Sequence, residues 1–150
     1  MKLAKLLGMF ALGAILWAAD PTVGTWKLNS AKSKYKVGMA PKEQTLTIGE
    51  AGNDLDVMVT GTSAEGTPIS THYTVPAAGG PGKIIESSYE AVSGKRMSAN
   101  EREVTYTKAG KVALTVHSRV SGDGKTLTVT VKGTDTQGKP VDAVAVYDKQ

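Results

Sequence analysis

Few side chains in this protein could carry out chemistry. Its 150 residues include no cysteine and two histidines, His72 and His117. Nucleophilic catalysis needs a serine, threonine or cysteine activated by a nearby base, and a zinc site needs a set of nitrogen or sulfur ligands. Each histidine stands at the parity opposite to the aliphatic residues of its segment, so both are predicted to face solvent. The sequence therefore predicts no catalytic set, no metal site and no cofactor.

The aspartates near glycines fit turns better than ion binding. Asp123 and Asp135 lie in glycine-containing connections, where an aspartate side chain accepts hydrogen bonds from the backbone just after it. The ligand spacing of a calcium loop is missing around both residues. We predict that they form turns, and we do not predict an enzyme.

Three tyrosines and one arginine form the most suggestive polar set. Tyr73, Tyr89 and Tyr106 are predicted to share the inward parity of three segments, and Arg102 has the parity of Tyr106 and is expected near one rim. An apolar pocket with a few polar groups is the usual design of a small-molecule site. These four residues are the predicted ligand-binding residues. The alternative is that the tyrosines belong to the core and bind the backbone through their hydroxyls.

The segments that must position these residues alternate between apolar and polar side chains. This period of two, with many threonines and valines, predicts half-buried β-strands, and Gly, Asn, Asp and Pro mark the turns between them. In the last segment Val144 and Val146 compete with Ala143, Ala145 and Tyr147 for the interior. The predicted strands are 23–28, 43–48, 55–59, 69–75, 83–92, 102–108, 112–120, 126–132 and 141–147, with a short tenth at 96–98.

Short connections between these strands favour antiparallel neighbours. A meander whose strands each have one apolar face must close or fold over to bury those faces and to protect its edges. We therefore predict an all-β fold, an antiparallel up-and-down β-barrel of about 8–10 strands. A two-sheet sandwich is the alternative, although the chain lacks long crossing connections. The lysine-rich segment 29–42 is predicted to be an exposed loop with one helical turn.

The first predicted strand contains the aromatic anchor of the fold. Trp26 follows Gly24 by two residues. A tryptophan buries a large area and usually finds a partner for its indole N–H, whereas a glycine lets another part of the chain approach the backbone closely. Gly24 and Trp26 are therefore predicted to be structural residues.

The chain also contains an internal repeat. Segment 57–69 resembles segment 129–141 at an offset of 72 residues: each has a strand, Gly-Thr, a polar turn with a second glycine, then proline and a new strand. The similarity indicates either a duplicated half-barrel or one hairpin loop used twice. In both cases the two loops are expected at corresponding positions in the sheet.

The N-terminus predicts export. Lys2 and Lys5 precede an apolar run over 6–19, which is typical of a secretory signal peptide and too short for a membrane span. We assign residues 1–19 to a signal peptide and 20–150 to the barrel domain, with an uncleaved N-terminal anchor as the alternative. Without Lys2 and Lys5, 16 basic residues face 14 acidic ones, so no nucleic-acid partner is predicted. A periplasmic or secreted monomer is expected.

Four motifs resemble those of small exported bacterial lipocalin-like proteins in the calycin superfamily, a largely uncharacterised group. The resemblance implies a calycin barrel and export, with the tryptophan closing one end under a basic side chain. Fatty-acid-binding calycins hold a carboxylate with an Arg-X-Tyr pair, but Ala145 stands two residues before Tyr147, so that site is not implied here. The motifs are Gly24-Thr25-Trp26-Lys27-Leu28-Asn29, 41–48, 123–129 and 146–150.

Taken together, these patterns predict an exported lipocalin-like barrel that binds a small apolar or amphipathic molecule in its interior. The alternative is a non-catalytic structural or envelope-interaction module whose barrel is filled by side chains.

Overall fold

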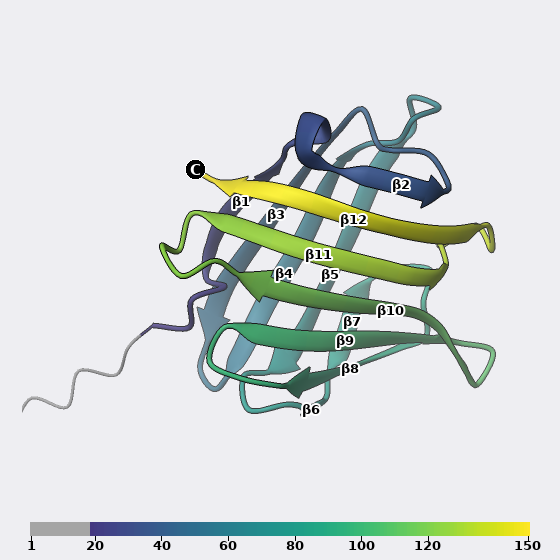
Figure 1. Ribbon diagram of the computed structural model, residues 1–150. Coiled ribbons are helices and arrows are strands. Elements are labelled where there is room, and N and C mark those ends of the chain that lie inside the picture. Colours follow the sequence, from purple (N-terminus) through teal and green to yellow (C-terminus); the bar gives the residue numbers. More distant parts are fainter. Residues whose placement is uncertain (1–18) are drawn as a thin grey trace, which may run out of the picture.

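Strands account for most of the structure, a computed structural model that describes residues 19–150 (Figure 1). The predicted signal peptide lies outside the described residues except for its last position. No helix in residues 19–150 has the length and apolar composition to cross a bilayer. The elements are β1 (Gly24–Leu28), a 3₁₀ turn η1 (Ser30–Lys32), β2 (Lys34–Val37), β3 (Glu43–Ala51), β4 (Asp54–Thr62), β5 (Pro68–Pro76), β6 (Gly80–Pro81), β7 (Lys83–Glu86), β8 (Ala91–Arg96), β9 (Glu101–Lys108), β10 (Lys111–Val120), β11 (Thr126–Thr134) and β12 (Pro140–Lys149).

All twelve strands belong to one antiparallel sheet. Its order is β6-β8-β9-β10-β11-β12-β1-β3-β4-β5-β7, with β2 paired to β12 outside this path. Chain neighbours are mostly sheet neighbours, and the last long strand returns to the first, so the predicted up-and-down barrel is confirmed and the sandwich alternative is wrong. The strand number exceeds the expected 8–10 because the short strands β2, β6 and β7 were not predicted separately.

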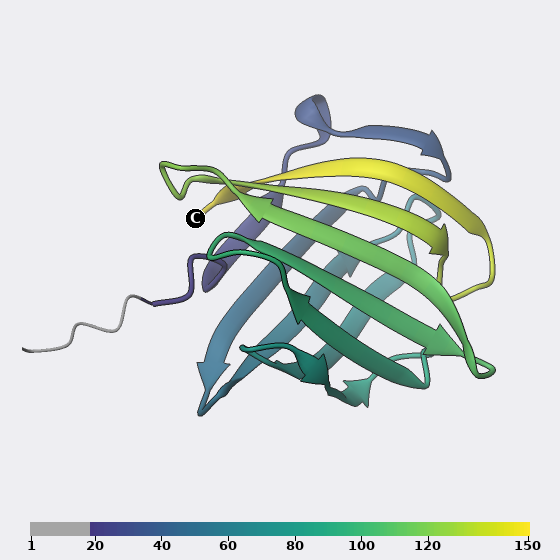
Figure 2. The ribbon, with the colours of Figure 1, turned by 60° about the horizontal axis from the view of Figure 1, so that its bottom comes forward.

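The barrel is nearly closed by the short segment that contains β6 and β7. β6 pairs with β8, and β7, which begins two residues after β6 ends, pairs with β5. One piece of chain therefore reaches both free edges of the sheet, at the bottom of Figure 2. Gly82 lies between the two strands, and a β-carbon there would come 2.2 Å from the carbonyl oxygen of Thr74. Only glycine allows this approach.

The predicted strand over 83–92 is wrong, because the chain leaves the sheet in the middle of that segment. β7 ends at Glu86, and β8 begins at Ala91 on the opposite edge. Between them the Tyr89 backbone N–H donates to Ser87 Oγ at 3.2 Å, a local turn that replaces ladder hydrogen bonds. Ile85, which has the parity of Tyr89 and was therefore expected inside with it, is 51% exposed. β8 also extends to Arg96, so no separate strand exists at 96–98.

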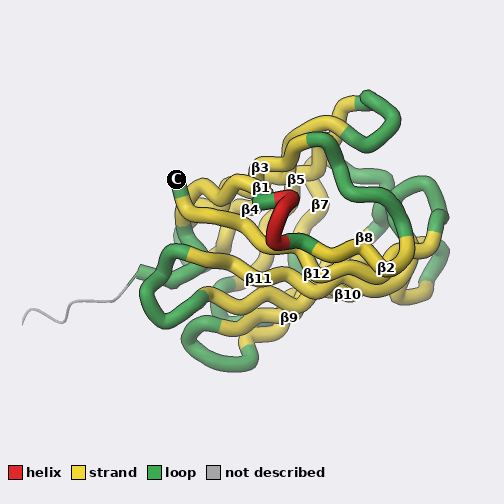
Figure 3. Tube along the Cα trace, turned by 45° about the horizontal axis from the view of Figure 1, so that its top comes forward, coloured by secondary structure: helices red, strands yellow, loops and turns green. Residues whose placement is uncertain are grey.

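The segment after β1 follows β12 instead of forming a free loop. β1 pairs with the end of β12, and β2 pairs with its beginning. The helical turn expected here is η1, where Asn29 Oδ1 accepts the Lys32 N–H. Figure 3 shows η1 and β2 lying along β12. β3 pairs with β1 but not with β2. The sheet is therefore open between β3 and β2, at the end of the barrel where β12 begins.

The last strand places its small residues inside. Ala143, Ala145 and Tyr147 are buried, whereas Val144 is 37% exposed. Tyr147 pairs with Leu127 on β11 and lies across from it in the same inner layer. The alternation of side chains could not decide which face of β12 points into the barrel, because both faces carry apolar residues.

The two halves of the internal repeat form the same hairpin loop. The loop between β4 and β5 and the loop between β11 and β12 have equivalent hydrogen bonds with nearly identical lengths, which confirms that they occupy corresponding positions. The bonds are Ser63 N to Thr67 O at 2.8 Å and Gly66 N to Ser63 O at 3.0 Å in the first loop, and Asp135 N to Lys139 O at 2.8 Å and Gly138 N to Asp135 O at 3.0 Å in the second.

This equivalence can be tested at the first glycine of each half. A β-carbon on Gly61 would lie 2.2 Å from the Glu43 carbonyl oxygen, and one on Gly133 would lie 2.1 Å from the Ala113 carbonyl oxygen. We expect Gly61→Ala and Gly133→Ala each to lower the free energy of unfolding by about 1–3 kcal/mol, because the partner backbone must shift. Urea unfolding followed by circular dichroism measures both.

Gly49→Ala is the matched control, since a β-carbon there meets nothing within 4 Å. It should change the free energy of unfolding by less than about 1 kcal/mol. If one of the two repeat variants behaved like the control, the two sites would not be equivalent.

Candidate ligand-binding cavity

The barrel encloses a cavity of about 610 Å³, within the usual range for sites that hold a small molecule. Aliphatic side chains from both halves of the sheet form most of its wall. Leu46, Ile48 and Val116 pack against both of the buried apolar clusters of the barrel. The aliphatic lining residues are Leu46, Ile48, Leu55, Val57, Val59, Ile69, Val75, Val104, Leu114, Val116, Leu127, Val129, Val131, Val141, Ala143 and Ala145.

All five tyrosines of the protein line this cavity. Tyr73, Tyr89 and Tyr106 lie in its wall as the alternation and spacing predicted, although Tyr89 reaches it from the β7–β8 loop. Tyr35 from β2 and Tyr147 from β12 were not predicted. Tyr147 belonged to the strand of undecided facing, and Tyr35 to a segment that looked like an exposed loop.

Three of the tyrosines form one aromatic cluster. The rings of Tyr73 and Tyr106 meet edge to face with centroids 5.4 Å apart, and those of Tyr89 and Tyr106 are 4.9 Å apart. Burial raises the pKa of Tyr73 to about 12 and raises the pKa of Tyr106 well above its ordinary value. Burial, together with the Asp135 carboxylate, raises the pKa of Tyr89 to about 12. The cavity wall therefore carries neutral phenols at physiological pH.

Two of the five phenol hydroxyls donate hydrogen bonds within the wall. Tyr89 Oη donates to the carbonyl oxygen of Thr134 at 2.8 Å, and Tyr147 Oη lies 2.9 Å from Gln44 Oε1. The contact between Tyr73 and Tyr106 lowers the pKa of Tyr73 and raises the pKa of Tyr106, but in both residues burial is the larger effect and raises the pKa.

The cavity opens between the two repeated loops. Glu65 from the first loop forms an exposed ion pair with Lys139 from the second, with 3.3 Å between Oε1 and Nζ. Asp135 also borders the opening, where its carboxylate accepts the backbone N–H groups of Gln137 and Lys139 at 2.9 Å. Asp135 is a turn former, as predicted, and the mouth carries charges of both signs.

Asp123, in the β10–β11 turn, has the same kind of local contact. Its carboxylate accepts the Ser121 hydroxyl at 2.6 Å and the Lys125 N–H at 3.1 Å. The Ser121 hydrogen bond lowers the pKa of Asp123. This confirms the predicted turn.

The opposite end is closed around Trp26. This side chain is fully buried and donates its indole N–H to the carbonyl oxygen of Thr22 at 2.8 Å. The Lys149 ammonium lies 5.4 Å from the ring centroid, within the range of a cation–π contact. A β-carbon on Gly24 would come 2.9 Å from Lys149 Cε, so the glycine makes room for the lysine. The arrangement agrees with the tryptophan beneath a basic side chain that the resemblance implied.

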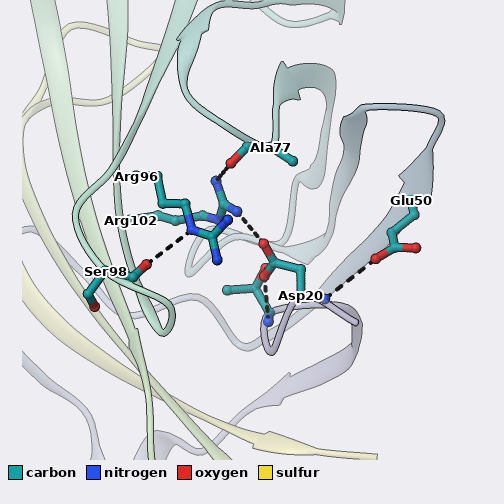
Figure 4. Close-up of polar contacts among 7 residues, drawn as sticks. Asp20, Glu50, Ala77, Arg96, Ser98 and Arg102 are labelled. Carbon is teal, nitrogen blue, oxygen red and sulfur yellow. Dashed lines mark hydrogen bonds and ion pairs between the residues drawn. The ribbon is translucent and has the colours of Figure 1, made fainter. Parts of the chain in front are cut away.

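Arg102 lies at this closed end of the barrel. It points inward from β9 as predicted, but its guanidinium forms an ion pair with Asp20 and donates to the Ala77 carbonyl oxygen at 2.7 Å (Figure 4). Burial alone would raise the pKa of Asp20, but hydrogen bonds from Thr22 and the Arg102 contact together hold it below its ordinary value. The sequence could not show this pair because its partners are 82 residues apart.

The two histidines lie on the outer face of the sheet, as predicted, but each has a carboxylate neighbour. His72 Nε2 is 2.7 Å from Asp56 Oδ1, and His117 Nε2 is 3.5 Å from Glu101 Oε2. Neither histidine borders the cavity. Both pairs come from neighbouring strands, so sequence spacing did not indicate them.

The described residues form a nearly closed antiparallel β-barrel around an apolar cavity, and solved barrels have a similar fold. Zebrafish ileal bile acid-binding protein, solved with cholic acid, is similar at a TM-score of 0.50 and 14% identity, over 87% of this chain and 99% of that one. A de novo designed fluorescence-activating β-barrel gives 0.43 and 14%, over 89% and 97%. A redesigned barrel bound to DFHBI gives 0.41 and 14%, over 88% and 98%. No protein-family profile and no curated protein matches the sequence.

Proposed function

We propose that this protein binds one small apolar or amphipathic molecule inside its barrel. The supporting observation is the cavity of about 610 Å³, whose wall contains many aliphatic side chains and a few tyrosines. The bile acid-binding barrel of similar fold, solved with cholic acid, supports this use of the interior. Tyr73, Tyr89 and Tyr106 are the proposed contact residues, whereas Arg102 is engaged by Asp20 and supports the closed end instead.

The alternative of a filled structural module is less well supported, because the open interior is what such a module would lack. Catalysis is not part of the proposal, because the histidine–carboxylate pairs lie outside the cavity. We further propose a lipocalin-like protein that is exported to the periplasm or secreted as a monomer. The N-terminal lysines and the apolar run over 6–19 support export.

Native mass spectrometry of the protein purified from its host tests the binding proposal. We expect an extra mass in the lipid or metabolite range, present at one copy per chain. Val59→Trp should remove it, because Val59 lines the cavity and a tryptophan there fills space that the ligand needs. The intact mass of the same sample also gives the position of signal cleavage.

Met58→Trp is the matched control. Met58 precedes Val59 on β4, points to the outer face and is 39% exposed, so the same new side chain should leave the bound mass unchanged. A wild-type protein that stays free of ligand after exposure to a host lipid extract would contradict the proposal, as would a bound mass that survives Val59→Trp.

A further inference from the structure

The lysine-rich segment 29–42 carries a cluster of positive charges. It contains four lysines and no acidic residue: Lys32, Lys34, Lys36 and Lys42. None of these four ammonium groups belongs to an ion pair within residues 19–150. Clustered charge of one sign attracts partners of the opposite sign, so an anion is the expected partner of this segment.

Two of these lysines belong to a groove on the outer wall of the barrel. The groove has a volume of about 200 Å³ and lies over β2, β11 and β12. Lys34, Lys36, Lys132 and Asp142 are its charged lining residues, whereas Tyr35, on the other face of β2, lines the cavity. An anion in the groove therefore meets three positive charges and one negative charge.

The mouth of the cavity adjoins this groove but has no excess of positive charge. Val141 lines the cavity, and the next residue, Asp142, lines the groove. Around the mouth three ammonium groups are balanced by three carboxylates, so the positive excess lies on the β2 side. These charged residues are Lys42 beside Gly66, Lys108 on the Thr136 carbonyl oxygen, Lys139, Glu43, Glu65 and Asp135.

Exposed apolar side chains accompany the lysines of the groove. Within residues 19–150, seven large apolar residues are exposed, and three of them belong to this region: Val37 at 44%, Met39 at 67% and Val144 at 37%. Val144 lies opposite Lys34 in the sheet, and Met39 borders the cavity. Anionic bilayers bind surfaces that combine lysines with apolar groups, because the lysines contact headgroup phosphates while the apolar groups enter the acyl boundary.

We propose that this surface docks against an anionic phospholipid bilayer, with Lys34, Lys36 and Lys132 on the headgroup phosphates and Met39 in the acyl boundary. Docking in this way brings the cavity mouth to the bilayer. It does not depend on the proposed ligand binding, because the contacts are all made by the outer surface.

Co-sedimentation with sucrose-loaded vesicles tests the docking. Protein purified from its host is mixed with vesicles of phosphatidylcholine alone, or of phosphatidylcholine and phosphatidylglycerol in equal parts. We expect the apparent affinity for the mixed vesicles to be at least about ten-fold higher, because the lysines face anionic headgroups. The difference should disappear at about 1 M salt, where the Debye length is about 3 Å.

The double variant Lys34→Gln, Lys36→Gln should bind the mixed vesicles about ten- to thirty-fold more weakly than the wild type. The matched control is Lys83→Gln, Lys95→Gln, which removes the same charge from exposed residues of β7 and β8. These strands lie toward the two ends of the sheet order, away from β12 and β2. The control should stay within about two-fold of the wild type, because charges beyond the Debye length are screened. Any contribution of residues 1–18 is common to all these proteins and cancels.

Met39→Gln distinguishes a bilayer from another anionic partner. It leaves every charge in place but removes an apolar group, so binding to the mixed vesicles should weaken about three- to ten-fold. An unchanged affinity in the folded variant would mean that the surface responds to charge alone, and would overturn the bilayer in favour of an acidic macromolecule.

Equal affinity of the wild type for the two kinds of vesicle would overturn the inference, as would equal effects of the two lysine double variants. Because the vesicles carry no added ligand, such a failure would leave the proposed cavity binding standing. That proposal fails separately, when no bound mass is found by native mass spectrometry.

Discussion

Replacing Trp26 with alanine should lower the free energy of unfolding by about 3–5 kcal/mol, the usual cost of removing a large buried aromatic side chain. Trp26 is fully buried beside Leu127 in the cluster that closes the barrel. Its loss would leave a cavity, an unpaired Thr22 carbonyl oxygen and a Lys149 without its aromatic partner. Because domains of this size are stable by only about 5–15 kcal/mol, the variant should be close to unfolding.

Urea unfolding followed by far-ultraviolet circular dichroism measures this effect, since the substitution removes the buried tryptophan whose fluorescence would otherwise report unfolding. Trp26→Phe separates the contributions: it keeps most of the apolar volume but loses the indole N–H, and we expect a cost of about 1–3 kcal/mol from the unpaired carbonyl group. Val112→Ala, on a side chain that is 63% exposed, serves as the surface control. A Trp26→Ala protein as stable as this control would show that the tryptophan does not hold the closed end together.

The antiparallel barrel could be predicted because its evidence is local. Alternation along each strand indicates which side chains point inward, and short turns indicate which strands are neighbours. The inward direction of Tyr73 and Tyr106 followed from this alone, as did the position of the two repeated loops. The prediction failed over 83–92, where apolar alternation continues through a change of sheet partner that only the three-dimensional structure reveals.

The polar contacts of the site were less predictable, because they join residues that are distant in sequence. Nothing in the strand that contains Arg102 indicates its ion-pair partner Asp20, which precedes the first strand. Tyr147 pairs with Gln44 across 103 residues. The sequence also could not show that the barrel contains a cavity. Alternation indicates which side chains point into the barrel but not whether they fill it.

Replacing Asp20 with asparagine should cost about 3–5 kcal/mol at neutral pH, because it leaves the buried Arg102 guanidinium without its counter-charge. The segment before β1 would also lose its anchor: Asp20 accepts both the hydroxyl and the backbone N–H of Thr22, and the Trp26 indole depends on the Thr22 carbonyl group. The double variant Asp20→Asn, Arg102→Met should be more stable than the single variant, since it removes the uncompensated charge.

The pH dependence of the free energy of unfolding distinguishes loss of the Asp20–Arg102 ion pair from a general loss of stability. The pKa of Asp20 in the folded protein lies below its ordinary value of 3.8. The stability that its ionised form contributes is therefore fully present above that value and is lost as the pH falls through the lower, folded pKa. Between neutral pH and about pH 2 the wild type should lose this contribution, and Asp20→Asn should show a correspondingly shallower decline in urea unfolding. Parallel pH profiles for the two proteins would mean that Asp20 is not an ionised partner of Arg102 in the folded barrel.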